Sequence, residues 1–153
     1  MTASPITIKR TNSNNPHFPE LIILLDNDLR ERYGDLLLEY DRYNEIVDLD
    51  TVLIAYYNDE PVGCVCFKKF DKDSIEVKRV FVKGTARGLG IAYKLLSELE
   101  LWAKENGFSN SVLETGTDQP EAMHVYERMG YSIIPNYRQY ADMDTSICMQ
   151  KTL

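Results

Sequence analysis

The sequence predicts a single α/β domain, of the α+β type, with a mixed, twisted central sheet flanked by helices. Three observations lead to this prediction. Strand-like segments dominate the first half of the chain, and strands alternate with amphipathic helices in the second half. The 153 residues are enough for one domain with a substantial core, so we expect residues 1–153 to form one domain.

The first half reads as a strand, a helix and a three-stranded meander. Residues 6–10 alternate between apolar and polar side chains, which is typical of a strand. From Pro16 to about Arg32 leucines recur at helical spacing, and Gly34 ends this helix. A second, shorter helical piece covers residues 36–43. Turn sequences separate three further predicted strands, at residues 51–57, 62–67 and 75–82.

The second half begins with a long amphipathic helix over residues 88–106, which Gly107 ends. A short apolar strand follows at residues 111–115. The next helix begins at Pro120, a residue suited to a first helical turn, and ends at Gly130. Two strands separated by a tyrosine-rich loop close the chain, at residues 131–134 and 145–151.

Composition and charge exclude several classes of function. The net charge of −7 argues against a surface for duplex nucleic acid, which requires clustered Lys and Arg, and it suits a small cationic substrate. No apolar run approaches the roughly 18 residues of a membrane span. The N-terminal residues lack the pattern of a signal peptide. We therefore expect a cytoplasmic protein with neither a nucleic-acid nor a membrane partner.

The three cysteines predict reduced thiols and no metal site. Cys64 and Cys66 flank one residue of a predicted strand, so both side chains point to one face. With Cys148 and only two histidines, they make a poor set of zinc ligands. We expect buried thiols that fill a sheet face.

A glycine-rich turn over residues 87–92 is the most informative segment. It lies between a strand and a helix, where unpaired backbone N–H groups form an anion site. The spacing of Gly84 and Gly88, with no following Gly-Lys pair, excludes a P-loop. Tyr93 stands where the dinucleotide fingerprint needs a third glycine, which argues against a Rossmann site.

Two motifs resemble those of the GNAT superfamily of acyl-CoA N-acyltransferases. Residues 87–92 resemble its Arg/Gln-x-x-Gly-x-Gly/Ala signature, in the expected context of a preceding strand and a following helix. Residues 122–131 are similar to its Ala-x-x-x-Tyr-Glu-x-x-Gly-Phe/Tyr helix. The resemblance is strongest over residues 51–131 and implies one N-acetyltransferase domain.

The resemblance implies acetyl-CoA as the co-substrate. Backbone groups of the strand would pair with the pantetheine arm, at Val80, Phe81 and Val82. The turn would hold the pyrophosphate through the cofactor-binding residues Arg87, Gly88, Leu89, Gly90, Ile91 and Ala92. The side chain of Arg87 contacts either a phosphate or solvent. Gln119 stands where many members carry an asparagine that contacts the cofactor, and we keep it as a cofactor-binding candidate beside Tyr126.

The resemblance also implies the catalytic groups. Tyr126 matches the tyrosine whose hydroxyl protonates the departing thiolate, and the alternative is a packed aromatic side chain. Glu76 and Glu114 are rival candidates for the general base. The alternative for Glu76 is a solvated carboxylate beside Lys78. His124 is expected at the surface or in a supporting position, not in catalysis.

The sequence says less about the residues that would bind the acceptor. If the fold is right, Arg32, Tyr33, Tyr137 and Tyr140 line the acceptor cleft, together with Tyr40 and Tyr43. The acceptor would be a small-molecule or peptide amine. Its identity, the oligomeric state (a homodimer is compatible with the family) and any acyl preference beyond acetyl do not follow from the sequence.

The predicted function is an N-acetyltransferase that moves an acetyl group from acetyl-CoA to a primary amine by direct attack in a ternary complex. Cys148 as a covalent acyl carrier is an alternative to direct attack. A non-catalytic CoA-binding sensor or interaction module of the same fold is the second hypothesis. A nucleotide-binding regulatory domain is the third.

Overall fold

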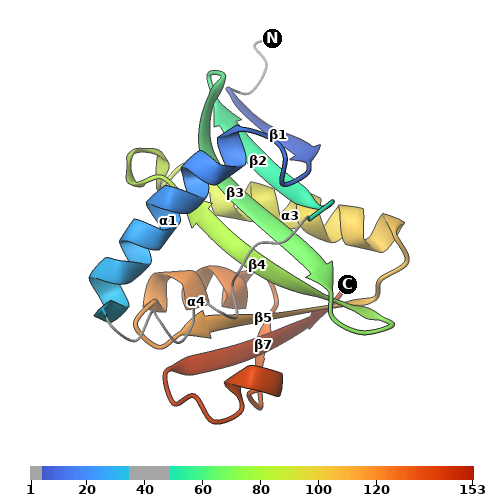
Figure 1. The fold of residues 1–153 in the computed structure, drawn as a ribbon. Helices are drawn as coiled ribbons and strands as arrows, with labels where there is room; N and C mark the ends of the chain where they lie inside the picture. Colours follow the sequence, from blue (N-terminus) through green and yellow to red (C-terminus); the bar gives the residue numbers. More distant parts are fainter. Residues whose placement is uncertain (1–4, 35–48) are drawn as a thin grey trace. The chain divides into compact units, whose positions relative to one another are not determined.

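The structure, a computed structural model, describes residues 5–34 and 49–153 (Figure 1). Its strands are β1 (Ile6–Thr11), β2 (Val52–Tyr57), β3 (Glu60–Lys69), β4 (Ser74–Val82), β5 (Asn110–Gly116), β6 (Ser132–Ile134) and β7 (Ser146–Thr152). Its helices are α1 (His17–Tyr33), α3 (Ile91–Glu105) and α4 (Pro120–Arg128), with the short 3-10 turns η2 (Gly84–Ala86) and η3 (Arg138–Tyr140). Within the described ranges the seven strands form one mixed sheet in the order β1-β2-β3-β4-β5-β7-β6, with β4 and β5 parallel. The predicted mixed α/β class is confirmed.

The chain forms two compact units. The first comprises Met1–Phe67 and Lys78–Leu99, and the second comprises Lys68–Val77 and Glu100–Leu153. β4 begins in the second unit and ends in the first, whereas α3 begins in the first and ends in the second. Each unit is described by itself below.

In the first unit, β1, β2 and β3 form an antiparallel meander. Asn58 and Asp59, with φ of 50° and 68°, make the two-residue turn between β2 and β3. Hairpin turns of this kind need positive φ at both central residues, which Asn and Asp tolerate better than most other residues.

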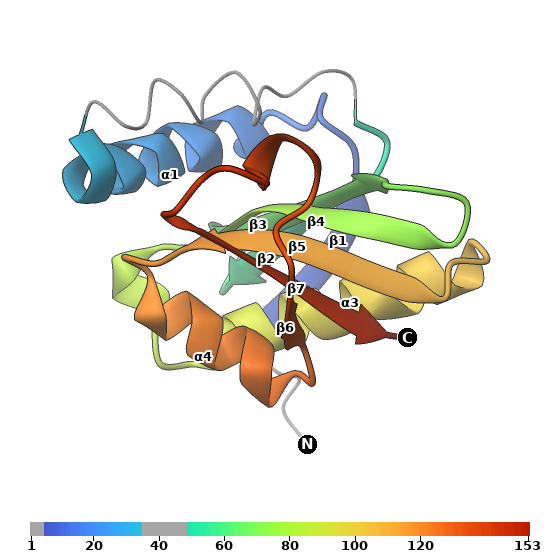
Figure 2. The ribbon, with the colours of Figure 1, turned by 90° about the horizontal axis from the view of Figure 1, so that it is seen from below.

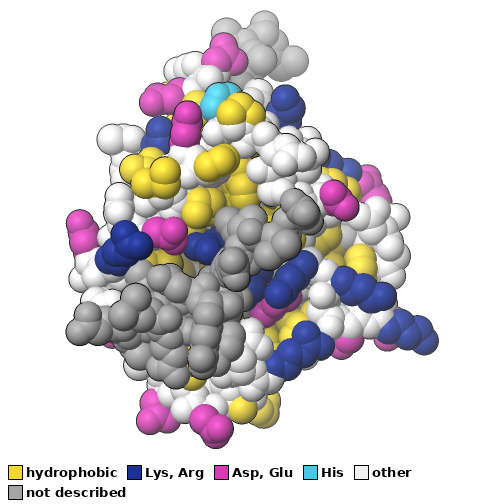
Figure 3. Space-filling model, viewed as in Figure 1, with side chains coloured by type: hydrophobic (Ala, Val, Ile, Leu, Met, Phe, Trp, Pro, Cys, Tyr) yellow, Lys and Arg dark blue, Asp and Glu magenta, His cyan; other side chains and the backbone are white. Residues whose placement is uncertain are grey.

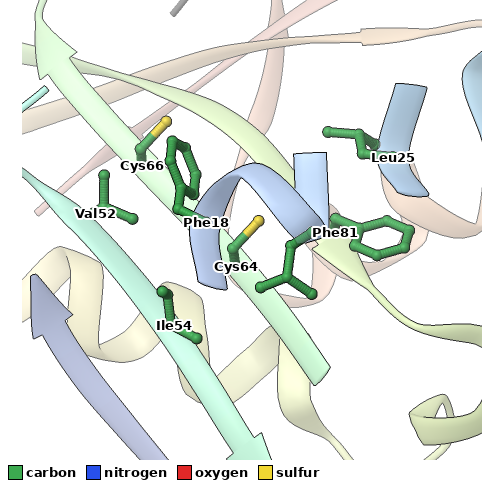
Figure 4. Packing of buried hydrophobic residues seen from close by; sticks show 8 residues of the cluster. Phe18, Leu25, Val52, Ile54, Cys64, Cys66 and Phe81 are labelled. Atoms are coloured by element: carbon green, nitrogen blue, oxygen red, sulfur yellow. The ribbon is translucent and has the colours of Figure 1, made fainter. Parts of the chain in front are cut away.

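The apolar side chains of α1 bury one face of this meander (Figure 4). Phe18, Leu21 and Leu25 recur at helical spacing and are buried against Val52, Ile54, Cys64, Cys66 and Phe81. The two thiols therefore fill a sheet face, as predicted, and both cysteines are free and buried. Burial raises the pKa of Cys64 far above its ordinary value, so this thiol stays protonated.

Gly63 shows how closely the opposite face is packed. A Cβ at this position would lie 2.8 Å from the Phe81 carbonyl oxygen and 3.4 Å from side-chain atoms of Ile91 and Leu95. Only glycine therefore lets β3 approach β4 and α3 this closely. Figure 2 shows α1 on one face of β2 and β3 and the first turns of α3 on the other.

The second unit is built around β5, β7 and β6. β7 pairs antiparallel with both neighbours, and the start of β4 pairs in parallel with β5. Figure 2 shows the loop between β6 and β7, which carries η3, on one face of β5, and α4 on the other.

Most element boundaries agree with the sequence-based predictions to within three residues. Gly107, at φ 91°, follows α3 as predicted, and Pro120 occupies the first turn of α4. α3 begins at Ile91, three residues later than predicted, because Gly88 and Gly90 have positive φ and cannot belong to a right-handed helix. The predicted helical piece at residues 36–43 lies outside the described residues.

Candidate functional site

The last part of β4, in the first unit, has an irregular backbone. Arg79 has a φ of 59°, a left-handed conformation that is uncommon for a non-glycine residue. The Cys64 thiol donates to the Arg79 carbonyl at 3.5 Å, and the Cys66 thiol donates to the Lys78 carbonyl at 3.3 Å. Arg79 also makes an ion pair of 2.8 Å with Asp26 of α1. These contacts fix the strand immediately before Val80–Val82, the segment expected to pair with pantetheine.

The glycine turn that follows has the backbone features expected of an anion-binding site. Gly88 and Gly90 have φ of 86° and 75°, and a Cβ at either position would meet nothing within 4 Å. Glycine is therefore required here by backbone conformation and not by crowding. The Lys94 N–H donates to the Gly90 carbonyl at 3.1 Å, so the amides of the residues from Ile91 to Tyr93 precede the helical ladder. Amides at a helix N-terminus attract negative charge.

The side chain of Arg87 contacts two groups of the protein itself. Its Nε donates to the Val82 carbonyl at 3.3 Å, and its Nη2 lies 3.9 Å from a carboxylate oxygen of Asp28 on α1. The side chain is 53% exposed. The sequence left phosphate and solvent open for Arg87, and Asp28 is a partner that sequence reasoning missed.

If Arg87 binds the cofactor, Asp28 would compete with it for this side chain. Asp28→Asn is then expected to tighten the binding of CoA about two- to fivefold, because exposed ion pairs are worth up to about 1 kcal/mol. Calorimetric titration with CoA at low salt measures this change. Asp142→Asn, which removes the same charge from an exposed position of the second unit, is the control. Unchanged or weaker binding in Asp28→Asn would contradict the competition.

In the second unit, the strand register gathers the candidate carboxylates on one face. Glu76 of β4 is opposite Val112 of β5, which is opposite Gln150 of β7. Two residues further along β5, Glu114 is opposite Cys148. Paired residues, and alternate residues along a strand, share a face. Glu76 and Glu114 therefore lie on the same face, in adjacent rows.

Glu76 is not a solvated carboxylate, so that alternative is wrong. Its side chain is 3% exposed, and Oε2 accepts a hydrogen bond of 2.8 Å from the Tyr137 hydroxyl. Lys68 Nζ lies 3.7 Å from Oε1. The positive φ at Arg79 also interrupts the alternation of side chains along β4. Strand periodicity therefore does not place Glu76 on the same face as Val80 and Val82.

Glu114 is half-buried, and its Oε2 accepts a hydrogen bond of 2.7 Å from the Ser146 hydroxyl. Its charge acts on two tyrosines of the same unit. Burial first and the charge of Glu114 second raise the pKa of Tyr126 well above its ordinary value of 10.0. The pKa of Tyr140 is also raised, by burial and then by the charges of Glu114 and Glu76. Both hydroxyls therefore stay protonated at neutral pH and can donate hydrogen bonds.

Tyr126 is both a packed aromatic side chain and a protonated hydroxyl. It is buried on α4, and its ring meets the Tyr131 ring edge to face at a centroid distance of 6.0 Å. The Tyr131 hydroxyl is hydrogen-bonded to Ser111 at 2.7 Å. Packing fixes the ring of Tyr126, and this does not exclude a role for its hydroxyl.

The loop between β6 and β7 is held by Asn136. Its Nδ2 donates to the carbonyls of Tyr140, Met143 and Ser146 at 3.0 to 3.2 Å. The loop thereby presents Tyr137, whose pKa is raised by burial and by the charge of Glu76. Sequence reasoning missed Asn136, and its only signal was a position beside Pro135 in a tyrosine-rich loop.

The other predicted site residues fall into three groups. Gln119 is the half-buried N-cap of α4, and His124 is exposed, as predicted. Arg32 and Tyr33 belong to the last turn of α1, but their side chains lie outside the description. Tyr40 and Tyr43 lie outside the described residues.

No three His, Cys, Asp or Glu side chains of the described ranges could together hold a metal ion. No helix in the described part of the chain has the length and apolarity of a membrane span.

Comparisons with known proteins agree with the fold described above. The model of the Acetyltransferase (GNAT) family matches residues 18–131. An IAA acetyltransferase of Azospirillum brasilense is 30% identical over 152 residues, which cover 88% of this chain and 99% of the relative. A Klebsiella pneumoniae protein assigned as an acyl-CoA N-acyltransferase has a structure with a TM-score of 0.79, 28% identity and 97% coverage of both chains. A GNAT family acetyltransferase from Elizabethkingia anophelis, solved with acetyl-CoA bound, has a TM-score of 0.72 and 21% identity, and covers 99% of this chain and 100% of its own.

Proposed function

Because the chain belongs to the Acetyltransferase (GNAT) family, we propose that it transfers an acetyl group from acetyl-CoA to a primary amine by direct attack in a ternary complex. The glycine turn is the observation that carries this proposal. Its positive-φ glycines and the amides that precede the helical ladder of α3 suit a pyrophosphate. Amine-dependent release of CoA from acetyl-CoA tests it.

The donor would be bound mainly by backbone groups. Val80 to Val82 would pair with the pantetheine amides, and Leu89 to Ala92 would hold the pyrophosphate. Arg87 would leave Asp28 and the Val82 carbonyl, its present partners, to meet a phosphate. When bound, acetyl-CoA supplies the thioester carbonyl that the amine attacks.

Tyr126 would protonate the departing thiolate. A general acid must be protonated when the bond breaks, and the raised pKa of Tyr126 meets this requirement. Cys148 has 0% exposure, so its thiol is not presented to a substrate. This burial favours direct attack over a covalent acyl intermediate on Cys148.

We assign the general base to Glu114 and a positioning role to Glu76. A base must take a proton from the acceptor's ammonium group, so that the neutral amine can attack the thioester, and pass this proton to solvent. Glu114 is half-buried, with the Ser146 hydroxyl as its neighbour, and its charge reaches Tyr126. Glu76 is almost fully buried between Tyr137 and Lys68, which suits a carboxylate that orients side chains.

Glu114→Gln is therefore expected to lower kcat about a hundredfold or more and to remove the acidic limb of the pH–rate profile. Glu76→Gln keeps the shape of the side chain and should retain that limb. Initial rates with one amine between pH 5 and pH 10 compare the two variants. Loss of the limb in Glu76→Gln alone would transfer the role of base to Glu76.

A further inference from the structure

The loop between β6 and β7 folds as three successive tight turns. The Tyr140 N–H donates to the Tyr137 carbonyl at 2.9 Å, and the Met143 N–H donates to the Tyr140 carbonyl at 3.0 Å. The Ser146 N–H then donates to the Met143 carbonyl at 3.0 Å. Each bond joins residues that are three apart, as in a β-turn or a turn of 3-10 helix. The carbonyls of Tyr140, Met143 and Ser146 therefore recur at a spacing of three residues.

One side chain, that of Asn136, gathers these three carbonyls. Its Nδ2 donates to Tyr140 and Met143 at 3.2 Å and to Ser146 at 3.0 Å. Because an amide nitrogen carries only two hydrogens, three acceptors use its whole donor capacity. A single half-buried side chain at the start of the loop thus holds the backbone at three points, the last of them ten residues away.

The two ends of this loop carry the hydroxyls that reach the candidate carboxylates. Tyr137 begins the first turn, and its hydroxyl donates to Glu76 Oε2 at 2.8 Å. Ser146 ends the third turn, and its hydroxyl donates to Glu114 Oε2 at 2.7 Å. Figure 2 shows this loop on one face of β5, the strand that carries Glu114. The amide of Asn136 is therefore linked through the loop to both carboxylates.

Glu76 also has a partner outside the loop. Figure 3 shows Lys and Arg side chains close together where β3 turns into β4. Lys68, near the end of β3, has its Nζ 3.7 Å from Glu76 Oε1. A nearby cation favours the charged form of a carboxylate, as a hydroxyl donor does. A change in the loop therefore removes only part of what surrounds Glu76, and Glu114 is the better reporter.

The other neighbours of Glu114 that bear on its charge are uncharged at neutral pH. Tyr126 of α4 and Tyr140 of the loop have raised pKa values, through burial first and then through the charge of Glu114. Cys148 of β7 lies opposite Glu114 and is buried. The Ser146 hydroxyl is thus the group through which the loop acts on Glu114, because a hydroxyl that donates to a carboxylate favours its charged form.

We propose that Asn136 is a positioning residue for the acetyl transfer. By holding three carbonyls of the loop, its amide keeps the Ser146 hydroxyl on Glu114 and the Tyr137 hydroxyl on Glu76. Asn136 acts through the loop and takes no part in the proton transfer itself. The inference rests on the proposed function, since Glu114 is the base assigned there.

Asn136→Ala tests this role, because it removes the amide and keeps both hydroxyls. We expect kcat to fall about tenfold or more with the KM for acetyl-CoA unchanged, since misplacing a catalytic group by about 1 Å can cost roughly a hundredfold. The acidic limb of the pH–rate profile should move to higher pH by about half a unit or more, because the charged form of Glu114 loses a hydrogen bond. A merely structural role would leave the limb in place.

Ser146→Ala removes the hydroxyl directly and should move the limb by at least as much. The double variant of Asn136→Ala and Ser146→Ala should move it no further than Ser146→Ala alone, because both changes act on one hydrogen bond. Additive shifts would show that Asn136 does not act through Ser146, and would overturn the proposal.

Asn12→Ala is the matched control. It removes another side-chain hydrogen bond to the backbone, which Asn12 Oδ1 accepts from the Asn14 N–H at 2.9 Å in the first unit. This variant should change neither kcat nor the limb. Asn136→Gln, which displaces the amide by one methylene, replaces Asn136→Ala in every measurement if Asn136→Ala does not fold.

Titration of Glu114 by NMR makes the test independent of turnover, with glutamates labelled with ¹³C at the side-chain carboxyl and Glu114→Gln to identify the signal. If amines release CoA but Asn136→Ala changes neither kcat nor the limb, the role of Asn136 is overturned and the acetyltransferase remains. If no amine releases CoA, a higher titration midpoint of Glu114 in Asn136→Ala, absent from Asn12→Ala, still supports the positioning of Glu114. An unchanged midpoint overturns it.

Discussion

Tyr126→Phe is expected to lower kcat about a hundredfold or more, with the affinity for acetyl-CoA unchanged, because general acid catalysis contributes roughly that factor. The variant keeps the buried ring and its edge-to-face contact with Tyr131 and removes only the hydroxyl. Single-turnover rates and calorimetric titration with acetyl-CoA separate chemistry from binding.

Tyr131→Phe is the matched control for that variant. It removes a neighbouring tyrosine hydroxyl, which is hydrogen-bonded to Ser111, from the same aromatic pair. It should cost about 1 kcal/mol of unfolding free energy and leave kcat nearly unchanged. Equal turnover in Tyr126→Phe and Tyr131→Phe would exclude Tyr126 as the acid.

The pH dependence of the wild-type protein gives a second test of Tyr126. A raised pKa keeps the hydroxyl protonated to higher pH, so loss of activity through this group must occur above the ordinary value of 10.0. Ionisation of Tyr126 should therefore produce no alkaline limb between pH 8 and pH 10.

Gly90→Ala is expected to weaken the binding of acetyl-CoA about tenfold or more. Alanine at φ 75° is strained, so the turn must change its backbone angles, and the amides at the start of α3 lose their common direction. Each hydrogen bond to a charged group is worth about 1.5–3 kcal/mol, which corresponds to roughly a tenfold or larger effect.

Gly107→Ala is the matched control, because it introduces the same backbone strain at a position remote from the turn. Gly107 has a φ of 91°, and a Cβ there would also meet nothing within 4 Å. Both variants should lower the unfolding free energy by about 1–2 kcal/mol, and only Gly90→Ala should impair binding. Similar affinities for acetyl-CoA in the two variants would show that the turn does not hold the cofactor.

The fold could be predicted from the sequence because the patterns that indicate it are local. Leucines at helical spacing, paired turn residues such as Asn58 and Asp59, and Gly107 each act within a few residues of chain. The glycine turn was equally local, because the function we propose for it depends on a backbone geometry that Gly88 and Gly90 permit.

The side-chain contacts of the candidate site could not be predicted from the sequence, because they join residues that are far apart in the chain. Tyr137 and Glu76 are 61 residues apart in the sequence, and nothing in either segment signals their hydrogen bond. The same holds for Asp28 and Arg87, which are joined only when α1 packs. The irregular backbone at Arg79 had no signal at all, because arginine is not a residue that favours positive φ.

The most direct test of the central claim is CoA release from acetyl-CoA, followed with a thiol reagent, across a panel of primary amines. We predict saturable release that depends on the amine, with equimolar formation of the N-acetyl product. Binding of acetyl-CoA without release above the amine-free rate for any amine would contradict an acetyltransferase and favour a CoA-binding module.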